Sequence, residues 1–144
     1  MSLTVTDYPN PRILVLGHGQ HGKDTAAELL AEAFNLNFIS SSLFAMDHAV
    51  WPILSLTNGD NDKEECYADR SSFREVWRRL IKMYNEPTLD RLAKGILASN
   101  DMYVGMRDYQ EFHAAQHMFD LILWIDTSGR KPYELSGRLF RPYR

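Results

Sequence analysis

The chain has 144 residues, of which 44% are apolar and 24% charged, as is usual for a globular protein. We expect one domain over 1–144, large enough to bury a core without disulfides. The single cysteine, Cys66, excludes an internal disulfide and a four-cysteine zinc site. No apolar run approaches the roughly 20 residues of a membrane span, and the N-terminus is unlike a signal peptide. The sequence therefore predicts a cytoplasmic protein that does not act at a membrane.

The net charge of -3 is unevenly distributed along the chain. Residues 130–144 sum to +4, which leaves -7 for the rest. An acidic body with a basic end does not match the broad basic face expected for general nucleic-acid binding, so we expect no stable nucleic-acid complex. The basic segment is either a solvated tail or a segment that closes over a small anionic ligand.

The first elements of the chain follow a strand–helix–strand pattern. Residues 12–16 form an apolar run that ends at Gly17, which predicts a buried strand. Apolar residues at helical spacing then predict a helix over 22–34, and residues 37–39 predict a second, short strand.

The middle of the chain predicts mainly helix. We expect 40–50 to be a loop that enters a helix, which Pro52 interrupts because proline lacks the backbone N–H. Ser72-x-x-Glu75 has the spacing of a capping box and opens an amphipathic helix that extends to Tyr84.

The next elements are again helix and strand. Pro87 suits the first turn of a helix whose apolar residues over 89–97, from Leu89 onward, face the core. Residues 102–104 predict a third strand. Asp108-x-x-Glu111 is a second capping pattern, and the helix that it opens reaches about residue 117.

Residues 121–125 predict a fourth strand, which is apolar throughout like the first. Strands that are apolar on both faces and alternate with amphipathic helices indicate a parallel sheet covered on both sides. The sequence therefore predicts a three-layer α/β fold.

The most informative segment follows the first strand and precedes the first helix. It contains the pattern G-x-x-x-x-G-K within the residues Gly17, His18, Gly19, Gln20, His21, Gly22, Lys23, Asp24 and Thr25. Glycines let the backbone curl so that successive N–H groups face phosphate oxygens, and the start of the helix adds its own N–H groups. A lysine at this position supplies a cation for the β- and γ-phosphates. We therefore predict a phosphate loop that binds ATP.

Asp24 departs from the usual pattern, which has Ser or Thr as a Mg²⁺ ligand at this place. The acid either holds Mg²⁺ through water or favours the positive end of the helix dipole. Thr25 follows and is the other candidate for the metal. His18 and His21 would contact phosphate or face solvent.

Gly-Lys-Asp-Thr after a glycine-rich loop resembles the deoxynucleoside monophosphate kinases of bacteriophages, which are relatives of adenylate kinase. Further stretches resemble the same family in the expected order. They are 38–42, 69–77, 103–107 and 124–126 with Arg130. The resemblance implies a phosphate-loop fold and ATP- and Mg²⁺-dependent phosphoryl transfer to a (deoxy)nucleoside monophosphate. For a phage protein, the compartment would be the host cytoplasm.

The resemblance also implies an acceptor region over about 40–85, where an arginine holds the phosphate of the acceptor. Arg70 and Arg74 are the candidates, and each could instead belong to a solvated helix face. Ser41 lies where the second strand ends, so its hydroxyl would contact the acceptor or cap the next helix.

Transfer of a γ-phosphoryl group depends on positioning and charge neutralisation, so we expect arginines besides Lys23 in the site. Arg107 follows the third strand, and ligands of α/β sheets bind beyond the carboxyl ends of strands. Arg130 follows the fourth strand within a lid-like basic segment at about 127–144. We assign Lys23, Arg107 and Arg130 to catalysis.

Few residues follow the fourth strand, whereas the kinases that the chain resembles have a fifth strand and a closing helix there. The sheet is therefore predicted to be without the last strand. This leaves two alternatives to a kinase, namely a non-catalytic nucleotide-binding module and an NTPase acting with a macromolecular partner. The oligomeric state also stays open, with a homodimer as one option.

Overall fold

The computed structural model describes residues 10–18, 22–57 and 62–126. Four parallel strands form one sheet in the order β2-β3-β1-β4. Their bounds are β1 (Ile13–Gly17), β2 (Phe38–Ser40), β3 (Met102–Val104) and β4 (Leu121–Ile125). The four strands lie where the sequence predicts them, and the parallel arrangement is confirmed.

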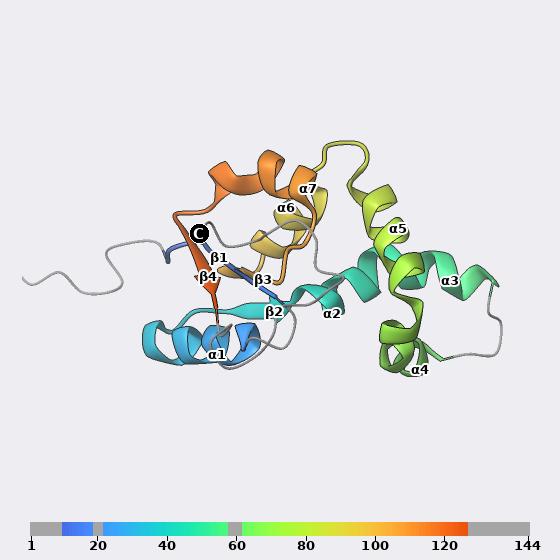
Figure 1. The fold of residues 1–144 in the computed structure, drawn as a ribbon, viewed down its shortest axis with the longest axis horizontal. Helices are drawn as coiled ribbons and strands as arrows, with labels where there is room; N and C mark the ends of the chain where they lie inside the picture. The colour runs from blue at the N-terminus through green and yellow to red at the C-terminus, as the bar shows by residue number, and fades with distance from the viewer. Residues whose placement is uncertain (1–9, 19–21, 58–61, 127–144) are drawn as a thin grey trace, which may run out of the picture.

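Helices cover both faces of this sheet (Figure 1). The helix α1 (Lys23–Phe34) covers one face, where Ala27 packs with Ile13 and Val15. The opposite face carries Leu14 and Leu16 and packs against the other helices. Strand residues alternate between two apolar clusters because successive side chains point to opposite faces. The protein is thus an α/β structure, and its layers fit a three-layer arrangement.

The helices on the second face belong to two groups. Next to the sheet lie α6 (Arg91–Leu97) and α7 (Tyr109–Ala115), the second of which continues into a 3₁₀ turn, Gln116–Met118. The other helices lie in the chain between β2 and α6. Figure 1 shows them as an arm beside the sheet. This helical arm consists of α2 (Ser41–Ala45), a π-helical turn (Met46–Val50), α3 (Trp51–Thr57), α4 (Lys63–Ala68), a 3₁₀ turn (Asp69–Phe73) and α5 (Arg74–Asn85).

The prediction that Pro52 interrupts a helix is wrong. The chain is helical without a break from Ser41 to Thr57, and the predicted loop at 40–50 is helix. The π-helical turn ends at Val50, two residues before this proline, and the N–H of Trp51 donates to the carbonyl of Met46, five residues back. A wider turn in front of the proline lets the helix continue where the regular bonding pattern would be broken.

The predicted capping box at Ser72 and Glu75 is also wrong. Ser72 lies in the 3₁₀ turn, and α5 begins at Arg74 with no side-chain cap at Phe73. Glu75 instead binds two arginines of its own helix, Arg78 and Arg79. Oppositely charged side chains three and four residues apart face each other on a helix, and Glu75 forms these ion pairs in place of a cap.

Two further details of the helices differ from prediction. Leu89 was expected to face the core, but it is 42% exposed and has a left-handed backbone, so α6 begins only at Arg91. Asp108 caps α7 as predicted, by accepting a hydrogen bond from the N–H of Gln110. Its expected capping partner, Glu111, is buried instead and points away from the cap.

Glu111 lies between β3, α5 and α7 without a cation beside it among the residues described. Its carboxylate accepts hydrogen bonds from the hydroxyl of Tyr103 and, at 2.7 Å, from Nδ2 of Asn85. Oδ1 of Asn85 accepts the N–H of Leu92, so this network joins four elements. Burial raises the pKa of Glu111 to about 7, and the nearby charge of Asp108 adds to the shift.

Across residues 10–18, 22–57 and 62–126 the structure contains no helix with the length and apolar character that a membrane span requires.

Candidate functional site

The candidate site lies where β1, β2 and β3 end, at the carboxyl edge of the sheet. Gly17 is the last residue of β1, and a Cβ atom there would lie 2.6 Å from the carbonyl oxygen of Ile125 in β4. Backbone atoms cannot move aside as a flexible side chain can. The close approach of the two strands therefore requires glycine where the predicted phosphate loop begins.

The loop ends at Gly22, which has a left-handed backbone and forms the N-cap of α1. Glycine adopts this conformation without the strain that a side chain causes. Gly22 makes no side-chain cap bond, and α1 begins directly after it with the positive end of its dipole beside the end of β1. Ala26 is the first residue whose N–H bonds within the helix, to the carbonyl of Gly22 at 2.9 Å. This is the arrangement that suits an anion.

Lys23 folds back over the loop. Its Nζ donates hydrogen bonds to the carbonyl oxygens of Gly17, at 3.0 Å, and His18, at 2.9 Å. The ammonium group therefore lies beside the end of β1, and its predicted contact with phosphates stays a prediction.

Gly105 brings a second strand end to the same lysine. This residue follows β3, has a left-handed backbone, and donates its N–H to the carbonyl of Val15 in β1. A Cβ atom at Gly105 would lie 3.2 Å from Oγ of Ser41 and 3.9 Å from Cε of Lys23. Ser41 and Lys23 therefore approach one point, which joins a predicted acceptor residue to the predicted phosphate loop. Gly105 was not among the predicted site residues.

Arg107 follows β3, which pairs directly with β1, and the side chain is exposed. The predicted role of Arg107 at the transferring phosphoryl group depends on β3 lying next to β1. Asp24 and Thr25 lie exposed on the first turn of α1. In the part of the chain that the structure describes, no three His, Cys, Asp or Glu side chains gather as a metal site. A Mg²⁺ ion here would depend on phosphate oxygens with Asp24 or Thr25 beside them.

His18 differs from both expectations for its side chain, because it neither faces solvent nor lies at the loop surface. The ring is buried and packs edge-to-face against Trp124, with centroids 5.4 Å apart. The part of His18 that contributes to the site is the backbone carbonyl that Lys23 binds.

Arg70 lies in the helical arm and stacks on a tyrosine that the sequence analysis did not single out. Its Cζ is 4.1 Å from the centroid of the Tyr67 ring, and Nη1 donates to the Tyr67 carbonyl at 3.0 Å. The Tyr67 hydroxyl lies 2.9 Å from Oγ of Ser42, which is 2.9 Å from Oγ of Ser40. A chain of hydroxyls thus connects the arm to the end of β2.

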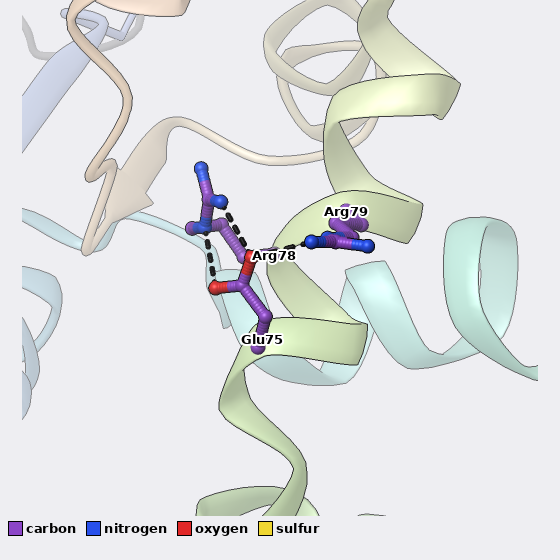
Figure 2. Close-up of polar contacts among 3 residues, drawn as sticks. All are labelled: Glu75, Arg78 and Arg79. Atoms are coloured by element: carbon purple, nitrogen blue, oxygen red, sulfur yellow. Dashed lines mark hydrogen bonds and ion pairs between the residues drawn. The ribbon is translucent and has the colours of Figure 1, made fainter.

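Arg74 is exposed at the start of α5 and is not brought to the strand ends by any described contact. Arg78, one turn further along α5, interacts electrostatically with Asp108, which follows Arg107. Figure 2 shows Glu75 holding the guanidinium of Arg78 with both carboxylate oxygens, at 2.7 and 3.0 Å. These hydrogen bonds lower the pKa of Glu75 to about 2 and raise that of Arg78. Of these two arginines of α5, Arg78 therefore has a described interaction with a residue next to Arg107, and Arg74 has none.

Two hollows lie in the arm. A groove of about 200 Å³ lies beside Tyr67, and its lining residues are Leu43, Met46, Asp47, Lys63, Glu64 and Tyr67. A second hollow of about 240 Å³ is lined by residues of α3, α4, the 3₁₀ turn and α5, among them Cys66 and Trp77. Residues of the arm line both hollows, and the groove includes Tyr67, whose hydroxyl lies 2.9 Å from Oγ of Ser42 near the end of β2.

Several predicted residues lie outside the residues that the structure describes. They are Gly19, Gln20 and His21 of the loop and Arg130 with the rest of 127–144.

Comparisons of the chain with protein-family models, with curated proteins and with solved structures give no match.

Proposed function

We propose that this protein transfers the γ-phosphoryl group of ATP to a (deoxy)nucleoside monophosphate. The observation that carries the proposal is the position of Lys23, whose Nζ lies over the carbonyls of Gly17 and His18 at the start of α1. A cation, the positive end of a helix dipole and a glycine backbone at one point form a site for a polyphosphate.

The second substrate is supported by what lies around that lysine. Ser41 approaches Lys23 at Gly105, and the helical arm that begins at Ser41 carries Arg70. The groove beside Tyr67 has apolar and aromatic side chains on which a base can lie, and two acids and a lysine also line it. An acceptor with a phosphate and a base would extend from the strand ends into the arm.

The chemistry requires that one P–O bond breaks and another forms. An oxygen of the acceptor phosphate attacks the γ-phosphorus, the bond to the β-phosphate oxygen breaks, and ADP leaves with that electron pair. Lys23 and the N–H groups of the first turn of α1 would neutralise the β- and γ-oxygens. Arg107 would approach the transferring group from β3, and Arg70 would hold the acceptor phosphate.

Asp24 or Thr25 would hold magnesium, which would supply positive charge to neutralise the phosphates during transfer. Asp24 and Thr25 are the described side chains that fit it, since both lie exposed beside Lys23 and offer oxygen atoms.

The test is ADP production from ATP and Mg²⁺ with each of the common ribo- and deoxyribonucleoside monophosphates as acceptor. We expect turnover that depends on the acceptor and falls on the order of 10²-fold in Lys23→Ala, because one charge at the transferring group is lost. Lys82→Ala is the matched control, since Lys82 is exposed on α5 and is not part of the candidate site. Turnover without any acceptor dependence would contradict the proposal.

Two further measurements would identify the alternatives to a kinase. ATP binding by calorimetry without turnover of any monophosphate would identify a non-catalytic nucleotide-binding module. Hydrolysis of ATP that a protein or nucleic acid stimulates would identify an NTPase with a macromolecular partner.

A further inference from the structure

Tyr67 contacts Arg70 in the helical arm and is linked through Ser42 to the end of β2 in the sheet. Its ring lies under the guanidinium of Arg70, and its backbone carbonyl accepts the hydrogen bond from Nη1 of the same arginine. Its hydroxyl lies 2.9 Å from Ser42, which continues to Ser40 at the end of β2. One residue thus holds a cation of the arm and is itself tied to the carboxyl edge of the sheet.

The stacking leaves most of the guanidinium of Arg70 available. An arginine has five N–H donors in a fixed plane, and one of them bonds to Tyr67 in the described part of the chain. The aromatic face holds that plane by a cation–π contact and does not use its edge donors. An exposed arginine without such a partner would sample many rotamers, whereas a fixed plane can bind two oxygens of one phosphate.

The hydroxyl chain sets where this arginine lies relative to Lys23. Ser40 and Ser42 flank Ser41, whose Oγ approaches the same point beside Gly105 as the lysine side chain. A displacement of Tyr67 from Ser42 would therefore change the distance between the arginine of the arm and the phosphate loop.

We propose that Tyr67 is a positioning residue that holds Arg70 for the dianionic phosphate of the acceptor and, through Ser42, fixes it relative to Lys23. The inference rests on the proposed function and adds to it the residue that orients the acceptor site.

The structure offers a matched control for this pair. Arg91 lies over the ring of Tyr84 at the same 4.1 Å, and its Nη1 donates to the Tyr84 carbonyl at 3.5 Å. No described residue receives or donates a hydrogen bond at the Tyr84 hydroxyl, and the pair lies between α5 and α6. Tyr84→Phe therefore removes a hydroxyl from a similar stacked pair that is not linked to the end of β2.

The experiment measures kcat and both KM values in Tyr67→Phe, Arg70→Ala, the double variant and Tyr84→Phe, with ATP, Mg²⁺ and dAMP, dCMP, dGMP or dTMP as acceptor. We expect Tyr67→Phe to raise the acceptor KM about fivefold, the effect of one hydrogen bond, with kcat and the KM of ATP within about twofold. Arg70→Ala should raise the acceptor KM more than about tenfold, and adding Tyr67→Phe to it should change nothing further. Tyr84→Phe should match the wild type.

Equal effects of Tyr67→Phe with and without Arg70 would overturn the inference, and so would an unchanged acceptor KM. If the wild type turns over no acceptor, the proposed function fails, and calorimetric binding of the same monophosphates decides the inference separately. Weaker binding by Tyr67→Phe than by Tyr84→Phe would support it, and equal binding or none would overturn it.

Discussion

Gly17 and Gly22 stand at the two ends of the predicted phosphate loop for different physical reasons. Gly17 needs space, because its Cβ position lies 2.6 Å from the carbonyl oxygen of Ile125. Gly22 needs backbone freedom, because its φ is +84° and no other atom lies within 4 Å of its Cβ position. Alanine would thus cause a clash between strands at one end and only local strain at the other.

We expect Gly17→Ala to lower the free energy of unfolding by about 2–3 kcal/mol, because β1 and β4 must move apart. Gly22→Ala should cost about 1 kcal/mol, the usual strain of a left-handed alanine. Urea unfolding followed by tryptophan fluorescence measures both. Equal losses in the two variants would contradict the different roles assigned to these glycines.

Glu111 makes stability depend on pH in a direction opposite to that of a paired carboxylate. Burial raises its pKa from an ordinary value of 4.5 to about 7, so the folded protein binds a proton that the unfolded chain has released between these values. The stabilisation is complete below pH 4.5 and is lost as the pH rises through 7.

We expect this loss to reach about 3 kcal/mol across the window from pH 4.5 to 7, at 1.36 kcal/mol per pH unit. Glu111→Gln keeps the shape and a neutral side chain, and should show a flatter profile over the same window. Urea unfolding at several pH values compares the two slopes. A wild-type slope equal to that of the variant would show that Glu111 does not titrate in this range.

At the scale of single residues, contacts between residues close in the sequence could be predicted, and contacts between distant residues could not. The place of Lys23 beside the predicted loop could be read from the sequence because Gly17 and His18, whose carbonyls it binds, lie within six residues of it. The contact of Tyr67 could not, since its partner Ser42 is 25 residues away and no spacing rule joins them. Glu111 was assigned to a cap because the short-range pattern was present, but Tyr103 and Asn85 offered it buried hydrogen bonds.

Helix starts in this protein follow two rules, and only one is visible in the sequence. Asp108 and Asp62 accept hydrogen bonds from N–H groups of α7 and α4, as capping residues do. Ser72 has the same sequence signature, but it lies inside a 3₁₀ turn before α5. A helix that continues directly from another turn has no free first turn for a side chain to cap.

We expect Asp108→Ala to lower the free energy of unfolding by about 1 kcal/mol, the usual value of a side-chain cap. Ser72→Ala should change it by less than about 0.5 kcal/mol, because the structure assigns Ser72 no capping bond. Thermal and urea unfolding of the two variants provide the comparison. A larger loss at Ser72 would mean that the sequence pattern does form a cap in solution.

The elements of the sheet were easier to predict than those of the arm. Strands β1 and β3 are buried on both faces, so their apolar runs end sharply at Gly17 and Gly105. In the arm, one wider helical turn before Pro52 preserves a helix that the rule for proline would end. That turn depends on tertiary packing of Met46, Ala49 and Val50, which no local pattern contains.

The fold as a whole was predictable in class but not in strand order. Apart from Ser40 at the end of β2, the strands have almost no polar residues, so their patterns do not distinguish a central strand from an edge strand. The structure shows the difference, because Leu121 of β4 is 46% exposed while Leu14 of β1 is fully buried. The position of β3 between β1 and β2 is a property of the assembled molecule that the pattern of no single strand contains.

Nucleotide binding should stabilise the whole molecule, because the candidate site joins three strands. ATP with Mg²⁺ at about one hundred times its dissociation constant adds about 2.7 kcal/mol, which corresponds to a rise in Tm of about 8 °C. Lys82→Ala should keep this rise and Lys23→Ala should lose most of it. Differential scanning calorimetry with ATP, and with adenosine as a ligand without phosphates, measures the effect. A rise with adenosine alone would contradict recognition through the phosphates.

The hydrogen bonds of Lys23 to Gly17 and His18 also have an entropic consequence. A lysine loses about 1.5–2 kcal/mol of rotamer freedom when it becomes fixed, and here the fold has already fixed it. An anion that binds there, as we propose, would meet an ammonium group that is preorganised, and its association would require little reordering of the protein. Binding of the polyphosphate should accordingly have a small conformational entropy cost and an association rate governed by diffusion and charge.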